Sequence, residues 1–200
     1  HYYWIGAPRY WLWVGGIFSA LEPLPILLMV FDTMHHVKKR QAKILNPLTW
    51  TYAVGCAIYH MIGAGVWGFL HTLPQINYYT HGSQVTVSHG HLAFFGAYAL
   101  LNLTTFYYAM PKLKGIEVYD DTRGRYGFWT MCIAMMLMGL FFGVAGVLQS
   151  YIERAMGLGY MTAQYYMRLW MGGVFFCGIA FLAGLLTTVT DLFTLRPAKR

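Results

Sequence analysis

Long apolar runs separated by short polar stretches dominate the hydrophobic pattern of this chain. Five runs are long enough to cross about 30 Å of hydrocarbon, because an α-helix rises about 1.5 Å per residue. They cover residues 10–35, 48–70, 85–110, 126–149 and 164–192, and we expect Pro111 to end the third. The pattern predicts an all-α, polytopic bundle of five transmembrane helices that forms a single membrane domain over residues 1–200.

Basic residues gather in the loops at one end of this predicted bundle. Eleven of the 14 Lys and Arg residues lie there: Lys38, Lys39, Arg40, Lys43, Lys112, Lys114, Arg123, Arg125, Arg196, Lys199 and Arg200. Only Arg9, Arg154 and Arg168 fall at the opposite end. The positive-inside rule therefore places the basic end in the cytoplasm, with His1 and residues 74–82 and 150–163 outside.

The composition agrees with a membrane protein. Charged residues make up 10% of the chain, against roughly 25% in soluble domains, and hydrophobic residues reach 58%. The net charge of +7 follows from the basic loops and does not indicate nucleic-acid binding. Cys56, Cys132 and Cys177 stand singly in separate apolar runs, which predicts neither a disulfide framework nor a CxxC metal site.

The chain begins at His1 without an initiator methionine and without the basic region of a signal peptide. We expect it to be a piece of a longer polypeptide. A site that uses His1 would then need partners from outside this sequence.

The strongest chemical signal is Ser88-His89-Gly90-His91, near the outer end of the third run. Each helical residue turns the chain by about 100°, so His89 and His91 point roughly 200° apart. The two imidazoles cannot share one metal, but each can bind a different one on its own side of the helix. Two hemes on one helix are the functional interpretation, and two histidines hydrogen-bonded between helices are the alternative.

Glu22 is the only acidic residue deep inside an apolar run. Pro23 and Pro25 follow it and free backbone carbonyls nearby, so the segment suits a proton carrier or a group beside a metal. The alternative is a neutral carboxyl bonded to a neighbouring helix. Asp191, near the inner end of the last run, is expected to be an interfacial residue.

Other ionisable residues carry weaker signals. His60, His71 and His81 are interpreted as hydrogen-bonded structural histidines rather than ligands. Arg154 and Arg168 lie against the positive-inside trend, which makes them candidates to bind heme propionates. Interfacial snorkelling of the two arginine side chains explains them equally well.

Five segments carry a family resemblance: residues 1–6 (HYYWIG), 18–25 (FSALEPLP), 63–69 (GAGVWGF), 77–82 (NYYTHG) and 88–98 (SHGHLAFFGAY). They resemble the catalytic subunit of bacterial respiratory nitric oxide reductase, a branch of the heme-copper oxidase superfamily. The match runs from end to end of the chain and implies the last five of the family's twelve core helices. The His-x-His spacing is shared by the whole superfamily, whereas the Glu22 segment and the aromatic outer loop point to the reductase branch.

The resemblance implies a role for four residues. His89 would be the axial ligand of the high-spin heme b3, and His91 an axial ligand of the low-spin heme b. His1 would be the second histidine of the pair that binds a non-heme iron, with Glu22 near that iron in proton supply. Heme b, heme b3 and non-heme iron are the implied cofactors, together with calcium near the heme propionates.

The implied reaction couples two nitric oxide molecules to nitrous oxide and water. The implied partners are nitric oxide, membrane lipid and an electron donor, for which a cytochrome c subunit is favoured over quinol. The enzyme would lie in the bacterial inner membrane with its active site towards the periplasm, and would need the missing N-terminal part for activity.

Two alternatives stay open at this point. An oxygen-reducing oxidase of the same superfamily shares the His-x-His helix, but the familiar oxidases carry a lysine in the helix that matches residues 10–35. Here no lysine precedes Lys38. A transporter or assembly subunit would use the buried histidines for ions or packing.

Overall fold

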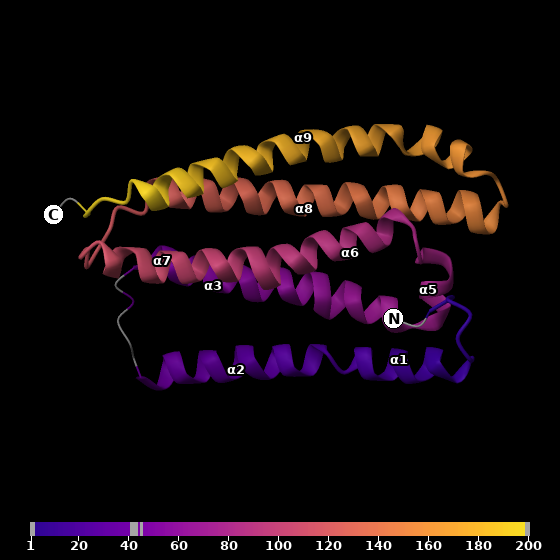
Figure 1. The fold of residues 1–200 in the computed structure, drawn as a ribbon, viewed down its shortest axis with the longest axis horizontal. Helices are drawn as coiled ribbons and strands as arrows, with labels where there is room; N and C mark the ends of the chain where they lie inside the picture. The colour runs from indigo at the N-terminus through magenta and orange to yellow at the C-terminus, as the bar shows by residue number, and fades with distance from the viewer. Residues whose placement is uncertain (1–2, 41–43, 45, 199–200) are drawn as a thin grey trace.

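The protein is a bundle of long helices, seen in a computed structural model that describes residues 3–40, 44 and 46–198 (Figure 1). Five helical spans are long and apolar enough to cross a membrane: Tyr10–Lys39, Pro47–Thr72, Gln84–Leu113, Thr122–Ala155 and Tyr160–Phe193. The described part of the chain forms no strand, only an isolated bridge between Tyr119 and Pro197. The predicted all-α polytopic fold is confirmed.

Several spans are built from more than one helical segment. The first consists of α1 (Tyr10–Ala20) and α2 (Pro23–Arg40), and the second of α3 (Pro47–His60), the π-helical η1 (Met61–Gly68) and α4 (Phe69–Thr72). The short α5 (Pro74–Thr80) follows in the next loop, at the end of the bundle opposite the basic loops. The third span consists of α6 (Gln84–Phe94), the π-helical η2 (Phe95–Leu100) and α7 (Leu101–Leu113). The fourth contains α8 (Thr122–Ser150) and η3 (Tyr151–Ala155), and α9 (Tyr160–Phe193) is the fifth.

The expectation that Pro111 ends the third span is wrong, because α7 continues through it to Leu113. Proline lacks the amide hydrogen that would bond the Tyr107 carbonyl four residues earlier, and the Thr49 hydroxyl donates to that carbonyl instead, at 3.2 Å. The Lys114 amide still donates to the Met110 carbonyl at 3.0 Å. The helix ends instead before Gly115, whose φ of +66° is a left-handed conformation that favours glycine.

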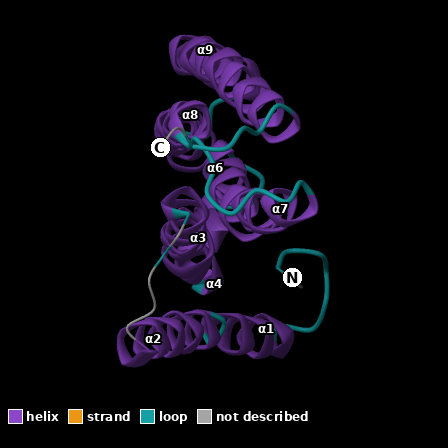
Figure 2. Cartoon of the chain, turned by 90° about the vertical axis from the view of Figure 1, so that its left-hand side faces the viewer, coloured by secondary structure: helices purple, strands orange, loops and turns teal. Residues whose placement is uncertain are grey.

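The spans lie side by side in a row, with α8 between α9 and the α3/α6 pair, and with α1 and α2 at the far side (Figures 1 and 2). Small residues let α8 approach its neighbours closely. A Cβ on Gly127 would lie 2.2 Å from the Thr188 Oγ1 atom of α9, and one on Gly146 would lie 2.0 Å from the Val85 nitrogen of α6. Only a hydrogen atom fits at these two contacts.

The second and third spans cross at a similarly close contact. A Cβ on Gly63 of η1 would lie 2.2 Å from the Ala93 nitrogen, and one on Gly96 of η2 would lie 2.3 Å from the His60 nitrogen. Two reciprocal glycine contacts thus fix where the spans cross, close to His89 and His91.

The basic end of the bundle contains a buried polar network. The Tyr107 hydroxyl donates to the Asp191 carboxylate at 2.9 Å, and the Tyr52 hydroxyl lies 3.1 Å from Thr188 Oγ1. The two tyrosine rings stack with their centroids 5.0 Å apart. Asp191 is therefore not the interfacial residue that the sequence indicated: only 6% of it is exposed, because Tyr107 supplies a buried donor.

The glycine crossing gives a prediction for Gly96→Ala. The added methyl group would meet the backbone at His60, so we expect the free energy of unfolding to fall by about 1–3 kcal/mol. Thermal denaturation of the detergent-solubilised full-length protein measures the effect. Gly172→Ala is the matched control, since no atom lies within 4 Å of its added Cβ. Equal midpoints for the two variants would contradict the close crossing.

Candidate functional site

His89 and His91 lie on opposite sides of α6, as their spacing predicted. His89 faces the second span, where its ring stacks on that of His71 at 5.1 Å between centroids. His91 faces α8, with its ring centroid 4.9 Å from that of Phe142. The helix that carries both begins after Ser83, whose Oγ accepts a hydrogen bond from the Val85 amide at 3.3 Å.

Both imidazoles have one nitrogen committed to a backbone carbonyl. The His89 Nδ1 atom lies 2.8 Å from the Gly63 oxygen, and the His91 Nδ1 atom lies 2.9 Å from the Val87 oxygen. A carbonyl oxygen only accepts, so each Nδ1 carries a hydrogen, and in the neutral imidazole this leaves the lone pair on Nε2. This is the arrangement that metal-ligating histidines adopt, because the bond on the other nitrogen fixes the ring and makes it a stronger ligand.

Ser88, the residue before His89, fixes the position of α6 against α8. Ser88 is completely buried, and its hydroxyl donates to the Gly139 carbonyl of α8 at 2.7 Å. Gly90 has no atom within 4 Å of an added Cβ, whereas a Cβ on Gly68 would lie 3.3 Å from the His89 Cε1 atom. Glycines thus leave room beside the His89 ring and at the backbone between the two histidines.

His71 supports the His89 ring. Its own Nδ1 donates to the Trp67 carbonyl at 2.8 Å, and its Nε2 lies 3.5 Å from Thr86 Oγ1. The stacked rings are inclined by only 24°. The sequence indicated that His71 is a hydrogen-bonded structural histidine, but it did not predict that the His71 ring contacts His89. It also did not predict that the Gly63 carbonyl accepts the hydrogen bond from His89.

The first described residues contact the C-terminal end of the second span. The Tyr3 hydroxyl donates to the Thr72 carbonyl, and the Trp4 indole donates to the Asn77 side chain at 2.8 Å. Burial raises the pKa of Tyr3, which keeps its hydroxyl protonated as a donor. His1 lies outside the described residues, so its role as an iron ligand stays a prediction.

Glu22 occupies the break between α1 and α2, where its amide donates to the Ser19 carbonyl at 3.2 Å. Its side chain is exposed, and no hydrogen bond or ion pair joins its carboxylate to another described residue. The described residues therefore do not provide the burial of Glu22 that the sequence indicated. Downstream of this break, α2 packs against η1, the segment that carries the Gly63 carbonyl.

The remaining candidates have structural contacts. The Arg154 guanidinium donates to the Tyr78 and His81 carbonyls at 3.5 and 3.4 Å, which ties η3 to the loop between the second and third spans. Arg168 lies over the Tyr165 ring, 4.2 Å from its centroid. A role for either arginine at heme propionates stays a prediction. Within the described ranges, no three His, Cys, Asp or Glu side chains gather closely enough to hold a metal ion.

Comparisons with known proteins agree with the helical architecture. The family model for "Cytochrome C and Quinol oxidase polypeptide I" matches residues 1–180. A nitric oxide reductase subunit of Stutzerimonas stutzeri is 44% identical over 208 residues, which cover 100% of this chain and 43% of the relative.

Oxidase subunits are more distant. A probable cytochrome c oxidase subunit 1 of Bradyrhizobium diazoefficiens is 24% identical over 148 residues, covering 74% of this chain and 22% of the relative. A putative cytochrome c oxidase subunit 1-beta of Streptomyces coelicolor is 23% identical over 150 residues, which cover 74% and 26%. The chain thus spans less than half the length of these relatives.

The buried serine gives a prediction about the register of α6. Ser88→Ala removes this bond between helices, at an expected cost of about 0.5–1.5 kcal/mol, because the Gly139 carbonyl lies inside α8 and keeps its helical donor. We expect faster amide hydrogen exchange along α6 in the detergent-solubilised full-length protein. Thr105→Ala is the control, because this exposed hydroxyl bonds only within its own helix, to Leu101 at 3.1 Å. Unchanged exchange in Ser88→Ala would show that the bond does not hold the helix.

Proposed function

Because the chain belongs to the Cytochrome C and Quinol oxidase polypeptide I family, we propose that it is the membrane-embedded C-terminal part of a nitric oxide reductase. The observation that carries the proposal is its 44% identity, over its whole length, to a nitric oxide reductase subunit. Identity to the oxidase subunits is only 24% and 23%. Glu22 supports the same choice, because no lysine precedes Lys38 in this span, whereas the familiar oxidases carry a lysine in the matching helix.

The proposed reaction converts two molecules of nitric oxide to nitrous oxide and water, with two electrons and two protons. A cytochrome c subunit is the favoured electron donor, with quinol as the alternative. The proposed location is the bacterial inner membrane, with the active site towards the periplasm. This orientation rests on the basic loops, which the positive-inside rule assigns to the cytoplasm.

His89 is proposed to hold the iron of heme b3, and His91 that of heme b. The carbonyl bonds on their Nδ1 atoms support this assignment, since both Nε2 atoms are left as ligands on opposite faces of α6. When bound, the two hemes and a non-heme iron supply electrons and stabilise negative charge that develops on oxygen. The polypeptide sets the orientation of each ligand and the space beside it.

The two ligands differ in how the chain holds them. The His89 ring is fixed by the Gly63 carbonyl of another span and by the stacked His71 ring. The His91 ring is fixed by Val87, one turn earlier in the same helix. Hydrogen bonding from Nδ1 would make each imidazole a stronger ligand for a heme iron.

Glu22 is proposed to carry protons to the non-heme iron, or to balance the charge at that iron. Its carboxylate is exposed at a break in an apolar span and has no partner among the residues described, which is costly for a group at membrane depth. A proton-carrying role beside a metal, with ligands from His1 and the rest of the longer polypeptide, would compensate this cost. A site near the outer face would take its protons from the periplasm.

Substitution of the two histidines tests the heme assignment in the full-length enzyme. We expect His89→Ala to abolish the high-spin heme signal and to lower turnover by at least about a hundredfold. His91→Ala should remove the low-spin optical bands and leave the high-spin heme in place. His81→Ala, in the exposed outer loop, is the control and should keep both hemes. Survival of heme b3 in His89→Ala would overturn the assignment.

Glu22→Gln tests the proton pathway. Loss of the ionisable group should lower turnover by about tenfold or more, while both heme spectra stay unchanged. Asp32→Asn is the control, because Asp32 is an exposed carboxylate of the same span. Wild-type turnover in Glu22→Gln would return this residue to a structural role.

The side of proton uptake is measured with the wild-type enzyme in sealed vesicles. We expect protons to come from the side opposite the basic loops. Uptake from the cytoplasmic side would refute the periplasmic route.

A further inference from the structure

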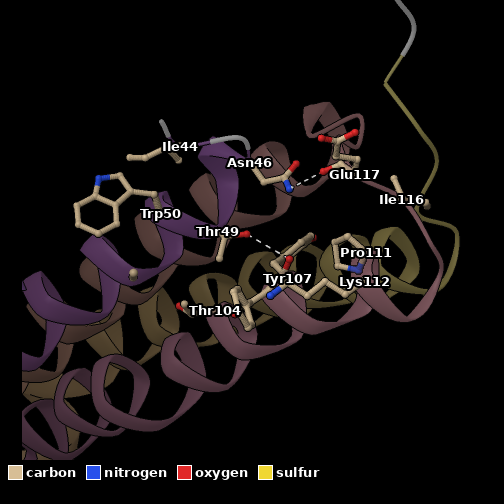
Figure 3. Close-up of a pocket in the computed structure, with 12 residues that line it drawn as sticks. Ile44, Asn46, Thr49, Trp50, Thr104, Tyr107, Pro111, Lys112, Ile116 and Glu117 are labelled. Carbon is tan, nitrogen blue, oxygen red and sulfur yellow. Dashed lines mark hydrogen bonds between the residues drawn. The ribbon is translucent and has the colours of Figure 1, made fainter. Parts of the chain in front are cut away.

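A cavity of about 450 Å³ opens at the basic end of the bundle, between α3, α7 and the loop after α7 (Figure 3). Its volume lies in the range of small-ligand sites. Ala53 and Thr104 line it on the two helices, while Trp50 and Tyr108 bring aromatic rings to its wall. Tryptophan and tyrosine side chains favour the level of lipid headgroups, which is where the basic loops place this end of the bundle.

Two opposite charges line the cavity without forming an ion pair. The Lys112 ammonium lies 3.5 Å from the centroid of the Tyr108 ring, and the Glu117 carboxylate has no hydrogen-bond or ion-pair partner among the described residues. A hydrogen bond to its backbone holds the loop that carries Glu117: the Asn46 side-chain amide donates to the Glu117 carbonyl at 3.1 Å. The lining of the cavity therefore includes one cation, which rests on the Tyr108 ring, and one anion without a partner among the described residues.

We propose that this cavity binds the headgroup of a phosphatidylethanolamine molecule from the cytoplasmic leaflet. The Lys112 ammonium would pair with the lipid phosphate, and the Glu117 carboxylate with the ethanolamine ammonium. The acyl chains would follow the apolar surface of α3 and α7 towards the membrane interior. The site is independent of the chemistry at His89 and does not rest on the proposed reaction.

Charge complementarity decides which phospholipid fits. Phosphatidylglycerol carries the phosphate but no ammonium group. Its phosphate can pair with the Lys112 ammonium, but the Glu117 carboxylate then faces a headgroup of net negative charge. Phosphatidylethanolamine satisfies both side chains. The site should therefore prefer the zwitterionic lipid even though the surrounding loops are basic and attract anionic lipids generally.

Native mass spectrometry of the full-length protein tests the proposal, after incubation with equal amounts of dioleoyl-phosphatidylethanolamine and dioleoyl-phosphatidylglycerol. We expect the wild type to retain phosphatidylethanolamine with a preference of about threefold or more. Lys112→Met should lower this retention by about tenfold, because the phosphate loses its partner. Lys39→Met removes the same charge from an exposed position on α2 that does not line the cavity, and should retain lipid as the wild type does.

Glu117→Gln gives a sharper test, because it should change the preference rather than the occupancy. Without the carboxylate, phosphatidylglycerol should bind at least as well as phosphatidylethanolamine. Equal retention by the wild type and Lys112→Met would overturn the proposal. So would a wild-type preference for phosphatidylglycerol, or no retained lipid because another segment of the longer polypeptide fills the cavity. The heme spectra of all three variants should match the wild type, which separates this result from the test of the reaction.

Discussion

The close crossing of the second and third spans is the constraint on which the candidate site depends. Gly63 lies against Ala93, and Gly96 lies against the backbone at His60, with room only for hydrogen atoms. His89 is one helical turn before Ala93, so the same contact brings its ring under the Gly63 carbonyl. Larger side chains at either glycine would separate the spans and remove the acceptor that orients the imidazole.

The two histidines differ in what they require from the fold. His91 takes its acceptor, the Val87 carbonyl, from its own helix, so its ring orientation follows from local geometry. His89 takes its acceptor from η1 and rests against His71, so its orientation depends on tertiary packing. Disturbance of the second span should therefore affect the environment of His89 far more than that of His91. The single helix α6 can thus position both imidazoles, while the orientation of each ring depends on a different part of the structure.

The sequence predicted much of this architecture, because a membrane restricts the possible folds so strongly. Apolar runs located all five spans, and the 100° turn per residue correctly placed His89 and His91 on opposite faces. The sequence could not predict contacts that depend on backbone carbonyls or on side chains far away along the chain. The Gly63 carbonyl has no side-chain signature, and the burial of Asp191 depends on Tyr107, which lies 84 residues earlier.

The two ends of the bundle use polar groups in different ways. Near the end opposite the basic loops, the Nε2 atoms of His89 and His91 have no hydrogen-bond partner among the described residues, whereas at the basic end the buried Tyr107 and Asp191 side chains bond to one another. Gly124 makes this possible, because a Cβ there would lie 2.6 Å from the Tyr107 hydroxyl and 2.8 Å from an Asp191 carboxylate oxygen. The same Tyr107 lines the cavity beside Lys112. The buried bond from Tyr107 to Asp191 therefore holds one wall of the cavity rigid, and the exposed Lys112 and Glu117 side chains can recognise a headgroup without carrying the stability of the fold.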